Sequence, residues 1–502
     1  MESFWSEKRT FIALVLSVLT LTTVIDITIV SVALSHIMGS IGANTDQASW
    51  IISGYVIAAT ICMPLSGLIA KLIGRKKAIL ICCFIFAINS ALCGMSTSLS
   101  EIVLFRVLQG ISGAFIPTLT MGYIIESFND KERPKILSVY TLMLISGPIA
   151  GPILGGFITQ HLEWRWIFYI NLPICIFCFL ILVKYMKESK IEPIKIDYLS
   201  FFFLCIGVGF IEFFLNDGNI SGWFSSETIT LSLIIGIIFI AFFIWRATLG
   251  KSVIDFRIFK YKNFTVACIL FMLYMCLIYG VLCYFPLFLE NSFKLPVETT
   301  GILVAPRGIV ALIATPILVK LCKKIDVRYF IIGGILCFGI SNYLLLLLSP
   351  ASSLIYLVLP VLLQGAAVAL FFMPLMIIAY YKFPKELSNS AGGMFSFFQM
   401  LGSSLGAALG AILISHMTQV NWHSMVKFIS PYNLNFKSWL QNSPIDITHH
   451  AKILLSSEII NSNSVFMSYI NMFYFSLAGC IILCLIPLFF NKINKVVKQH
   501  KI

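Results

Sequence analysis

The sequence GPIAGPILGG, from Gly147 to Gly156, lies in an apolar run that extends from about Ile136 to Ile158 and is long enough to cross a bilayer. Small residues recur at positions 147, 151 and 155, on one face of a helix, so that a second helix can approach closely. Pro152 removes a backbone donor in mid-helix and permits a kink. This pattern is typical both of two helices that rock against each other and of static, tightly packed helices.

The composition of the chain is that of a membrane protein. Of its 502 residues, 59% are hydrophobic and only 11% are charged, and the mean hydropathy is +0.95. These values lie far outside the range of soluble globular domains. No short charged and apolar leader with a small-residue cleavage site precedes the run from Phe11 to Leu34, so we expect this run to be a retained membrane span and not a removable signal.

Fourteen apolar runs follow one another along the chain, each close to the length that a helix needs to cross the hydrocarbon core. The runs cover approximately residues 11–35, 48–70, 78–97, 101–125, 136–160, 166–186, 197–215, 228–248, 264–289, 299–321, 329–349, 352–380, 389–415 and 465–490. The sequence therefore predicts an all-α integral membrane protein with fourteen transmembrane helices.

The net charge of +13 is distributed unevenly over the loops. If both termini are cytoplasmic, 28 of the 35 Lys and Arg residues lie in cytoplasmic segments, and Arg106 and Arg307 lie within spans. Five lie on the opposite side, namely Arg165, Lys294, Lys427, Lys437 and Lys452. This asymmetry predicts that both termini face the cytoplasm. It also accounts for the basic excess, so we do not expect nucleic-acid binding.

The chain contains an internal repeat. Gln109-Gly110 in the fourth span is followed by Pro117, and Gln364-Gly365 in the twelfth span is followed by Pro374, about 255 residues later. We therefore expect two related six-helix bundles, residues 1–190 and 261–502, with an inserted helix pair and its linkers in residues 191–260. Two such halves that face each other across a midplane site are typical of a rocking secondary transporter.

Six short motifs occur in order on successive spans. They are Val24-Ile-Asp26-Ile-Thr28 with Ala33-Leu34, Gly67-Leu-Ile-Ala-Lys71-Leu-Ile-Gly74-Arg75-Lys76, Arg106 with Gln109-Gly110, Gly147 with Gly151-Pro152 and Gly155-Gly156, Trp164-Arg165-Trp166 with Asn171 and Pro173, and Trp223 with Ser226. On these residues the chain resembles the major facilitator superfamily, and within it the fourteen-spanner drug:proton antiporters of the EmrB type, over almost its whole length.

This resemblance implies a proton-coupled exporter that works with a periplasmic membrane-fusion adaptor of the EmrA type and an outer-membrane channel. It also implies that the glycine and basic motifs on the second to fifth spans serve transport or gating. Two positions depart from the family pattern. Lys71 stands where the superfamily motif usually has Asp, so a salt bridge from this position to an arginine of the other bundle is not expected, and Ser31 stands where Asn is common.

Asp26 and Arg106 are the main candidates for coupling, because a charge in the bilayer needs a partner or a task. Their positions within the first and fourth spans place both about 8 to 14 Å below the outer surface, so the two side chains can meet. We expect Asp26 to carry the coupling proton, with Arg106 and Gln109 adjusting its affinity for the proton. The alternative is a permanent ion pair that only holds the two spans together.

Other polar residues are weaker candidates. Glu212 and Asp197 are expected to be interfacial caps at the two ends of the seventh span. Arg307 is a candidate for the substrate cavity that would attract anionic compounds, although a structural pair with Glu290 or Glu298 is an equal alternative. The aromatic and amide residues proposed to line the same cavity are Phe115, Phe398 and Gln399.

Residues 416–463 form a polar stretch between the last two spans, which we expect to be a periplasmic loop that contacts the adaptor. His449 and His450 in this stretch lack further metal-ligand spacing. The fourteen cysteines lie in or beside apolar runs, so we expect packing roles for them and neither disulfide bonds nor a metal site. No cofactor is expected.

The sequence contains no phosphate-binding loop and no nucleophile elbow, so we do not expect an enzyme. The interpretation that follows is a proton-driven exporter of hydrophobic or amphipathic small molecules in a bacterial cytoplasmic membrane. The alternative is a dedicated exporter of one endogenous metabolite, such as a siderophore. A channel or a membrane sensor that does not transport is a third, less favoured class.

Overall fold

The computed structural model describes residues 2–43, 45–129, 132–189, 191, 197–218, 221–250, 252, 254–322, 324–428, 433, 434, 436, 438 and 449–490. The N-terminal half is built from α1 (Glu2–Ile41), α2 (Thr45–Cys62), α3 (Ser66–Ile73), α4 (Arg75–Met95), α5 (Leu99–Ser127), α6 (Arg133–His161), α7 (Trp166–Tyr169) and α8 (Asn171–Tyr185). The inserted pair is α9 (Tyr198–Asp217) and α10 (Glu227–Thr248). The C-terminal half contains α11 (Lys262–Leu282), α12 (Phe285–Phe293), α13 (Val297–Leu321), α14 (Val327–Leu346), α15 (Ile355–Ala379), α16 (Ser388–Val426) and α18 (His449–Leu483).

Short 3₁₀ turns lie between these helices at η1 (Met63–Leu65), η2 (Trp223–Ser225), η3 (Phe256–Lys260) and η4 (Lys385–Leu387), and η5 (Ile486–Phe489) follows α18. In the described part of the chain, 13 helices are long and apolar enough to cross a membrane, and the count is 14 when the bent α6 is taken as one span. Each of these helices overlaps one of the fourteen apolar runs, so the predicted all-α fold is confirmed.

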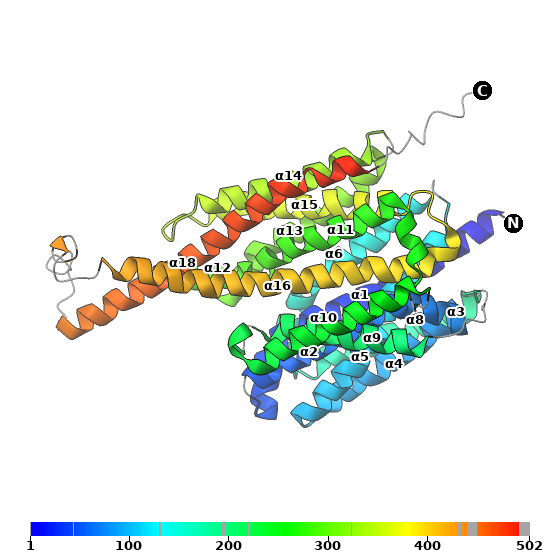
Figure 1. Cartoon of the computed structure of the whole chain (residues 1–502), viewed down its shortest axis with the longest axis horizontal. Coiled ribbons are helices and arrows are strands. Elements are labelled where there is room, and N and C mark those ends of the chain that lie inside the picture. The colour runs from blue at the N-terminus through cyan, green and yellow to red at the C-terminus, as the bar shows by residue number, and fades with distance from the viewer. Residues whose placement is uncertain are drawn as a thin grey trace.

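The two halves repeat the same set of helix pairings. In the N-terminal half α1 packs on α6, and α5 packs on both α2 and α4; in the C-terminal half α11 packs on α16, and α15 packs on both α13 and α14. In Figure 1 the C-terminal half lies above the N-terminal half, and α16 runs along the boundary between them. The internal repeat seen in the sequence thus corresponds to two bundles of equivalent helices.

The hydrogen bonds between the two halves, as far as the structure describes them, gather toward the end of the molecule that carries α3. There the Arg75 guanidinium donates through Nε to Asn389 Oδ1 at 2.9 Å and through Nη2 to Glu126. Ser66 donates to the carbonyl of Asn389, and Arg133 donates to the carbonyl of Tyr380 at 2.6 Å. The halves are therefore held together at this end, which we call the loop end.

The small-residue face of α6 packs against α1 of the same half. A Cβ atom at Gly147 would collide with Val24, and one at Gly151 would collide with the Thr28 side chain, whose hydroxyl also reaches the carbonyl of Gly147 at 3.3 Å. At Gly155 the nearest atom, from Ile29, would lie at 3.0 Å. This face is therefore a tight contact inside one bundle, the close approach that both interpretations of the sequence predict.

Helix α6 also bends. The bend is 41° and lies between Pro148 and Ala150. Because a proline has no N–H to offer to the residue four positions earlier, Pro152 leaves the carbonyl of Pro148 without its helical donor. The bend lies at the position where that hydrogen bond is missing.

The polar stretch between the last two spans is helical at both ends, which corrects the expectation of a loop over all of residues 416–463. Helix α16 continues without a break to Val426, and α18 starts at His449, so both ends of the stretch are helix. A helix of 39 residues is about 58 Å long, roughly twice the thickness of the hydrocarbon core. Figure 1 shows α16 and α18 extending together beyond the other helices, on the side opposite to the loop end.

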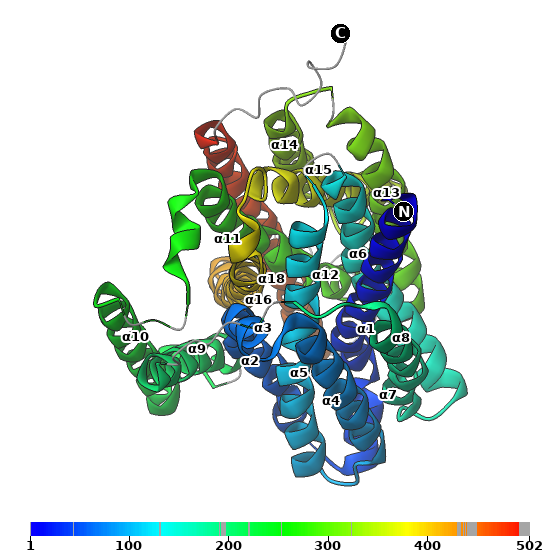
Figure 2. The same cartoon turned by 90° about the vertical axis from the view of Figure 1, so that its right-hand side faces the viewer.

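The inserted pair lies at the side of the molecule. Figure 2 shows α10 at the periphery, with α9 between α10 and α2. Helix α9 contacts α2 of the N-terminal half and also α16 of the C-terminal half. The inserted pair is thus attached to both halves through α9.

Candidate functional site

The centre of the N-terminal half holds a buried ion pair. Asp26 on α1 and Arg106 on α5 are both 0% exposed, and Arg106 Nη1 donates to Asp26 Oδ2 at 2.5 Å. The sequence predicted that these two side chains meet, because their positions within their spans placed them at the same depth. The structure brings them into direct contact.

Two carboxamides complete the hydrogen bonding of the Asp26 carboxylate. Gln109 Nε2 donates to Asp26 Oδ1 at 3.0 Å, and Asn171 Nδ2 donates to the same oxygen at 2.7 Å. Gln109 Oε1 in turn accepts from Arg106 Nη1 at 2.7 Å, and Asn171 also donates to the Ser90 hydroxyl at 2.9 Å. Side chains of α1, α5 and α8 therefore meet at one carboxylate, and Ser90 of α4 joins the same network through Asn171.

The other side of the Arg106 guanidinium is held less completely. Its Nε donates to the carbonyl of Ile51 at 3.1 Å, and its planar face lies 4.4 Å from the centre of the Tyr55 ring. Its Nη2, however, is buried without a hydrogen-bond partner in the described residues. A buried donor without a partner is costly, so this guanidinium is one acceptor short in the conformation observed.

This arrangement can couple a proton to a structural change. The ionised carboxylate accepts three side-chain hydrogen bonds, from Arg106, Gln109 and Asn171. A proton on Asp26 would remove the counter-charge of Arg106, and a buried unpaired charge is strongly destabilising. Binding and release of a proton would therefore alter the contacts among the helices that meet here.

Sequence reasoning missed Asn171, Ser90 and Tyr55 as members of this cluster. Asn171 was noted only as part of the Trp164 to Pro173 motif, without a role. Its signal was available, because a carboxamide in an apolar span requires a polar partner. Which partner it has depends on the packing of α8 against α1 and α4.

The C-terminal half contains a related but unbalanced site. A Cβ atom at Gly110 would meet the backbone carbonyl of Tyr55, and one at the equivalent Gly365 would meet the backbone carbonyl of Arg307. Arg307 on α13 therefore occupies the position that Tyr55 has on α2. Within the part of the chain that the structure describes, its one hydrogen bond runs from Nη1 to Gln364 Oε1, at the long distance of 3.5 Å.

No carboxylate among the described side chains forms an ion pair with Arg307. Glu290, one of its two predicted structural partners, forms no ion pair with it in the described structure, and the side chain of Glu298, the other, lies outside the described residues. Gln364 is 0% exposed, and its Nε2 has no hydrogen-bond partner in the described structure. The C-terminal half thus presents two sets of N–H donors with hydrogen-bonding capacity to spare.

The other predicted cavity residues are not brought together with Arg307 by any described contact. Phe115 is buried in the N-terminal core, and Phe398 packs edge-on against Phe259 of η3, with ring centres 6.2 Å apart. Gln399 is half-buried, and its backbone carbonyl accepts from Ser403. Their role in a substrate cavity stays a prediction.

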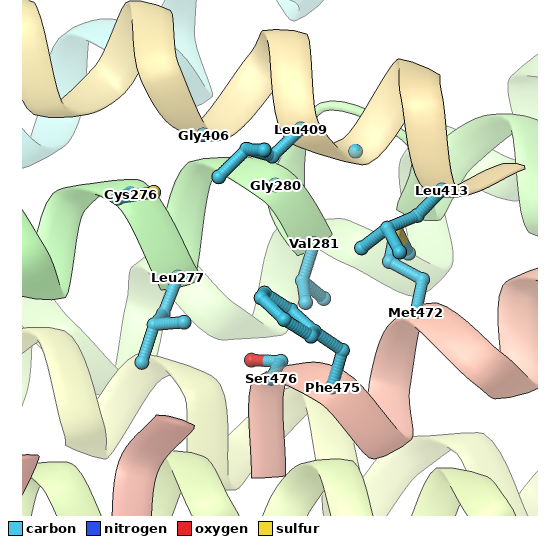
Figure 3. A pocket seen from close by; sticks show the side chains of 11 residues that line it. Cys276, Leu277, Gly280, Val281, Gly406, Leu409, Leu413, Met472, Phe475 and Ser476 are labelled. Atoms are coloured by element: carbon cyan, nitrogen blue, oxygen red, sulfur yellow. The ribbon is translucent and has the colours of Figure 1, made fainter. Parts of the chain in front are cut away.

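A separate pocket lies between α11, α16 and α18, as Figure 3 shows. Its walls are mainly apolar, with Leu277, Val281, Leu413 and Phe475 among them and the hydroxyl of Ser476 as a polar group. None of the predicted substrate residues lines it. No charged side chain lines this pocket, and its volume of about 20 Å³ is too small for a cargo molecule.

The basic loop after α2 joins the N-terminal half to other parts of the chain. Lys71 Nζ lies 3.8 Å from a carboxylate oxygen of Asp255, on the segment after the inserted pair. Lys71 is therefore the cation of its ion pair, whereas the Asp of the usual family motif would be the anion of one. Gly74 has a φ of +87°, and a Cβ atom there would collide with Glu188. Glu188 in turn accepts from the backbone N–H of Lys76 at 2.8 Å and so caps α4.

The two acids of the inserted pair differ from each other. Asp197 precedes α9 and pairs with Arg246 of α10 at 2.6 Å, near one end of both helices. Glu212 is 0% exposed, so the expectation that it is an interfacial cap is wrong. Its distance from the end of α9, judged from the sequence alone, did not reveal that α2 and α16 cover it.

Comparison with known proteins identifies the family. The family described as "Major Facilitator Superfamily" matches residues 16–283 and again residues 266–494. The chain is 32% identical over 427 residues to the multidrug export protein EmrB of Haemophilus influenzae, and the match covers 84% of each chain. It is 31% identical over 418 residues to the fatty acid resistance protein FarB of Neisseria gonorrhoeae, covering 82% of each.

Among solved structures, the proton:xylose symporter XylE aligns over 94% of this chain and 95% of its own, with a TM-score of 0.60 and 15% identity. At that identity the likeness concerns the fold alone. The double family match also agrees with the internal repeat, since each match covers one half. The resemblance seen in the motifs is confirmed: the chain belongs to the major facilitator superfamily, and within it to the group of the EmrB-type multidrug export proteins.

Proposed function

We propose that this protein is a proton-driven exporter of hydrophobic or amphipathic small molecules across a bacterial cytoplasmic membrane. The observation that carries the proposal is the fully buried Asp26–Arg106 pair. The carboxyl group of Asp26 can bind a proton, and it lies in a hydrogen-bond network that joins four helices of one half. The names of the relatives supply the direction and the kind of cargo, since three of them are multidrug export proteins.

The proposed cycle uses the conformation described above as its outward-facing state, because the hydrogen bonds between the halves lie toward the loop end. A proton that reaches Asp26 neutralises the carboxylate and leaves Arg106 without its counter-charge. The cost of that unpaired charge favours a rearrangement of α1 against α5 that opens the loop end. There the proton leaves, the ion pair forms again, and the cargo that has entered from the cytoplasm is carried outward.

The test is proton-coupled transport in liposomes with an imposed pH gradient. Asp26→Asn keeps the shape of the side chain and removes its charge, so we expect substrate-dependent proton movement to be abolished. Asp197→Asn removes a paired carboxylate near the end of a helix and serves as the matched control, with transport retained. Transport by Asp26→Asn with an unchanged dependence on the gradient would exclude Asp26 as the carrier.

The partners and the location are part of the same proposal. Both termini face the cytoplasm, and the extended ends of α16 and α18 stand in the periplasm, where they form the surface for a membrane-fusion adaptor that leads to an outer-membrane channel. The long helical projection supports this placement, because a span needs only about 20 residues.

Crosslinking tests the proposed contact with the adaptor. A crosslinker attached to Trp422→Cys, an exposed position on that projection, should capture the adaptor, whereas one attached to Tyr329→Cys, exposed on α14, should not.

A second candidate function is favoured by Arg307. A guanidinium that pairs with no carboxylate among the described side chains, next to a carboxamide whose nitrogen has no described partner, is suited to a cargo that carries a carboxylate. The relative FarB is named for resistance to fatty acids, which are such compounds. A dedicated exporter of one anionic metabolite, such as a siderophore, would use the same two side chains.

Arg307→Gln separates the two functions. We expect the apparent affinity for decanoate to fall roughly tenfold or more in this variant, as for the loss of a hydrogen bond to a charged group, while lipophilic cations are transported as before. Arg307→Lys should keep part of the affinity, because it retains the charge but not the planar fork. If cations and decanoate are affected equally, Arg307 has a structural role and no part in selecting the cargo.

A further inference from the structure

Helix α9 carries a carboxyl group inside the protein that the proposed transport cycle does not use. Glu212 is 0% exposed, although it belongs to the inserted pair at the side of the molecule (Figure 2). It is covered because α9 packs against α2 of the N-terminal half, against α10 and against α16 of the C-terminal half. Glu212 thus lies where the inserted pair meets both halves.

The two oxygens of the Glu212 carboxyl differ in their contacts. Oε2 accepts from Asn216 Nδ2 at 3.1 Å, and Asn216 also donates to the backbone carbonyl of Glu212 at 2.8 Å. Oε1 is buried and has no hydrogen-bond partner in the described structure. The hydroxyls of Thr60 on α2 and Ser404 on α16 lie beside the carboxyl group.

The charged groups around Glu212 offer no counter-ion. On α10 the charged residues are Glu227 and Arg246, near its two ends, and Arg246 is paired with Asp197. Helix α16 has no charged residue before His416. The remaining titratable groups on α9 are Tyr198, Cys205 and Asp217, and those on the part of α2 that packs beside it are Tyr55 and Cys62.

An ionised carboxylate in these surroundings is unfavourable, because an apolar interior with one hydrogen bond does not replace the lost hydration. A proton on Oε1 removes the charge and turns the oxygen that has no partner into a donor. The hydroxyl hydrogen of Thr60 is already donated to the carbonyl of Val56 at 2.9 Å, so the Thr60 oxygen is left as an acceptor. A neutral carboxyl group can donate to such an acceptor and a carboxylate cannot.

We propose that Glu212 is a second proton-binding site, neutral while α9 is packed between α2 and α16, which releases its proton when α16 moves away from α9. The reason is geometrical: Ser404 and Thr60 belong to different halves, and they flank the same carboxyl group. When the halves separate along α16, water reaches Oε1 and solvates the carboxylate. Asp217, the last residue of α9, is 6% exposed and lies on the side of Glu212 toward that end of the helix. When the halves close again, Ser404 returns to the carboxyl group of Glu212.

This assignment goes beyond the proposed function, because it holds whether or not Asp26 carries the coupling proton. The measurement is infrared spectroscopy of the purified protein in lipid as the pH is raised, which separates the carbonyl stretch of a protonated carboxyl from the bands of a carboxylate. We expect the wild-type protein to show a protonated carboxyl that disappears at alkaline pH. This band should be missing in Glu212→Gln at every pH and retained in Glu227→Gln, the matched control on α10.

A second variant tests the role of the C-terminal half. Ser404→Ala removes a hydroxyl that can donate to the Glu212 carboxylate, which makes the ionised form less stable, so the band should persist to a higher pH than in the wild type. Spectra of wild type and Glu212→Gln that are identical would overturn the proposal. So would a band that stays at the most alkaline pH at which the protein is folded, because such a proton is never exchanged.

The same preparations distinguish failure of this proposal from failure of the proposed function. Asp26→Asn should abolish proton-coupled transport and leave the Glu212 band in place. In liposomes we expect Glu212→Gln to transport with fewer protons moved per cargo molecule than the wild type. An unchanged ratio would show that Glu212 binds a proton without taking part in transport, and it would overturn the proposed release during the cycle.

Discussion

The two halves of the molecule have equivalent helices, but they differ in how the charge of the arginine at their centres is compensated. Both place a Gln-Gly pair on the central helix, and both glycines allow the backbone of a neighbouring helix to approach. In the N-terminal half the arginine is neutralised by Asp26 and its hydrogen bonds are nearly complete. In the C-terminal half Arg307 has no carboxylate partner in the described structure, and the amide nitrogen of Gln364 is unused.

This difference separates what a repeat must keep from what it can change. The close approach of two backbones determines the fold of each bundle, so glycine is needed in both. The side chains around it do not determine the fold, and they can take on different tasks. We interpret the N-terminal half as the part that handles the proton and the C-terminal half as the part that meets the cargo.

The largest loss of stability is expected at the Asp26–Arg106 ion pair of the N-terminal half. Arg106→Met should destabilise the protein by about 3–5 kcal/mol, because it leaves a buried carboxylate without its partner. Adding Asp26→Asn to it should recover most of that stability but not proton-coupled transport. Thermal unfolding in detergent measures the first effect and the liposome assay the second. A double variant no more stable than Arg106→Met would show that the ion pair does not account for the loss.

The next largest loss of stability is expected at the glycines of the two Gln-Gly pairs, and it should be equal in the two halves. Gly110→Ala and Gly365→Ala each place a methyl group against a backbone carbonyl, of Tyr55 and of Arg307 respectively, and backbone cannot move aside as a side chain can. We expect each to cost about 1–3 kcal/mol in unfolding free energy, as for overpacking in a core. Gly156→Ala, where a Cβ atom meets nothing within 4 Å, is the control and should be close to neutral. A large difference between the first two variants would contradict the structural equivalence.

A smaller and asymmetric effect is expected for the two carboxamides. Asn171→Leu removes a donor to the Asp26 carboxylate and should cost about 1.5–3 kcal/mol, the range for hydrogen bonds to charged groups. Gln364→Leu removes an amide whose nitrogen has no partner among the described residues, so it should be neutral or slightly stabilising while the affinity for carboxylate cargo falls. Equal losses of stability in both variants would mean that the C-terminal half is as well compensated as the N-terminal one.

The smallest effect is expected where the N-terminal half meets the segment that leads to the C-terminal half. Lys71→Ala removes an ion pair with Asp255 at the surface and should change stability by less than about 1 kcal/mol. The Arg257 side chain, through its hydrogen bonds, lowers the pKa of Asp255 below its usual value. The contribution of this carboxylate is therefore present above its unfolded pKa of about 4 and is lost only as the pH falls through the lower folded value.

The effect of Lys71→Ala should consequently be constant from neutral pH down to about pH 5, which unfolding curves at several pH values would check. If the effect of Lys71→Ala on stability changed markedly with pH within that range, Lys71 would interact with a titrating group other than Asp255. Arg257→Ala offers the matched variant, since it removes the closer partner of the same carboxylate at 2.6 Å.

Much of the fold could be predicted from the sequence, and so could the pairing of Asp26 with Arg106. Apolar runs of span length, the basic bias of the loops and the repeated Gln-Gly pair depend only on composition and spacing. The helical nature of the ends of residues 416–463 was missed, because polar residues in a long stretch between spans resemble a loop when their packing partners are unknown. The partners of Asn171 and the cover over Glu212 were missed for a related reason: each is supplied by helices distant in the sequence.

The sequence by itself determined that the chain spans a membrane, that it has two related halves, and that it belongs to this family. These properties follow from hydrophobicity, charge and short motifs, which act locally or repeat along the chain. Only the tertiary structure decided that Asp26 accepts hydrogen bonds from Asn171 as well as from Gln109, that no described carboxylate pairs with Arg307, and that Glu212 is buried between both halves. The reason is physical: the energy of a charge in an apolar interior depends on every group within a few ångströms, and those groups come from helices that only folding brings together.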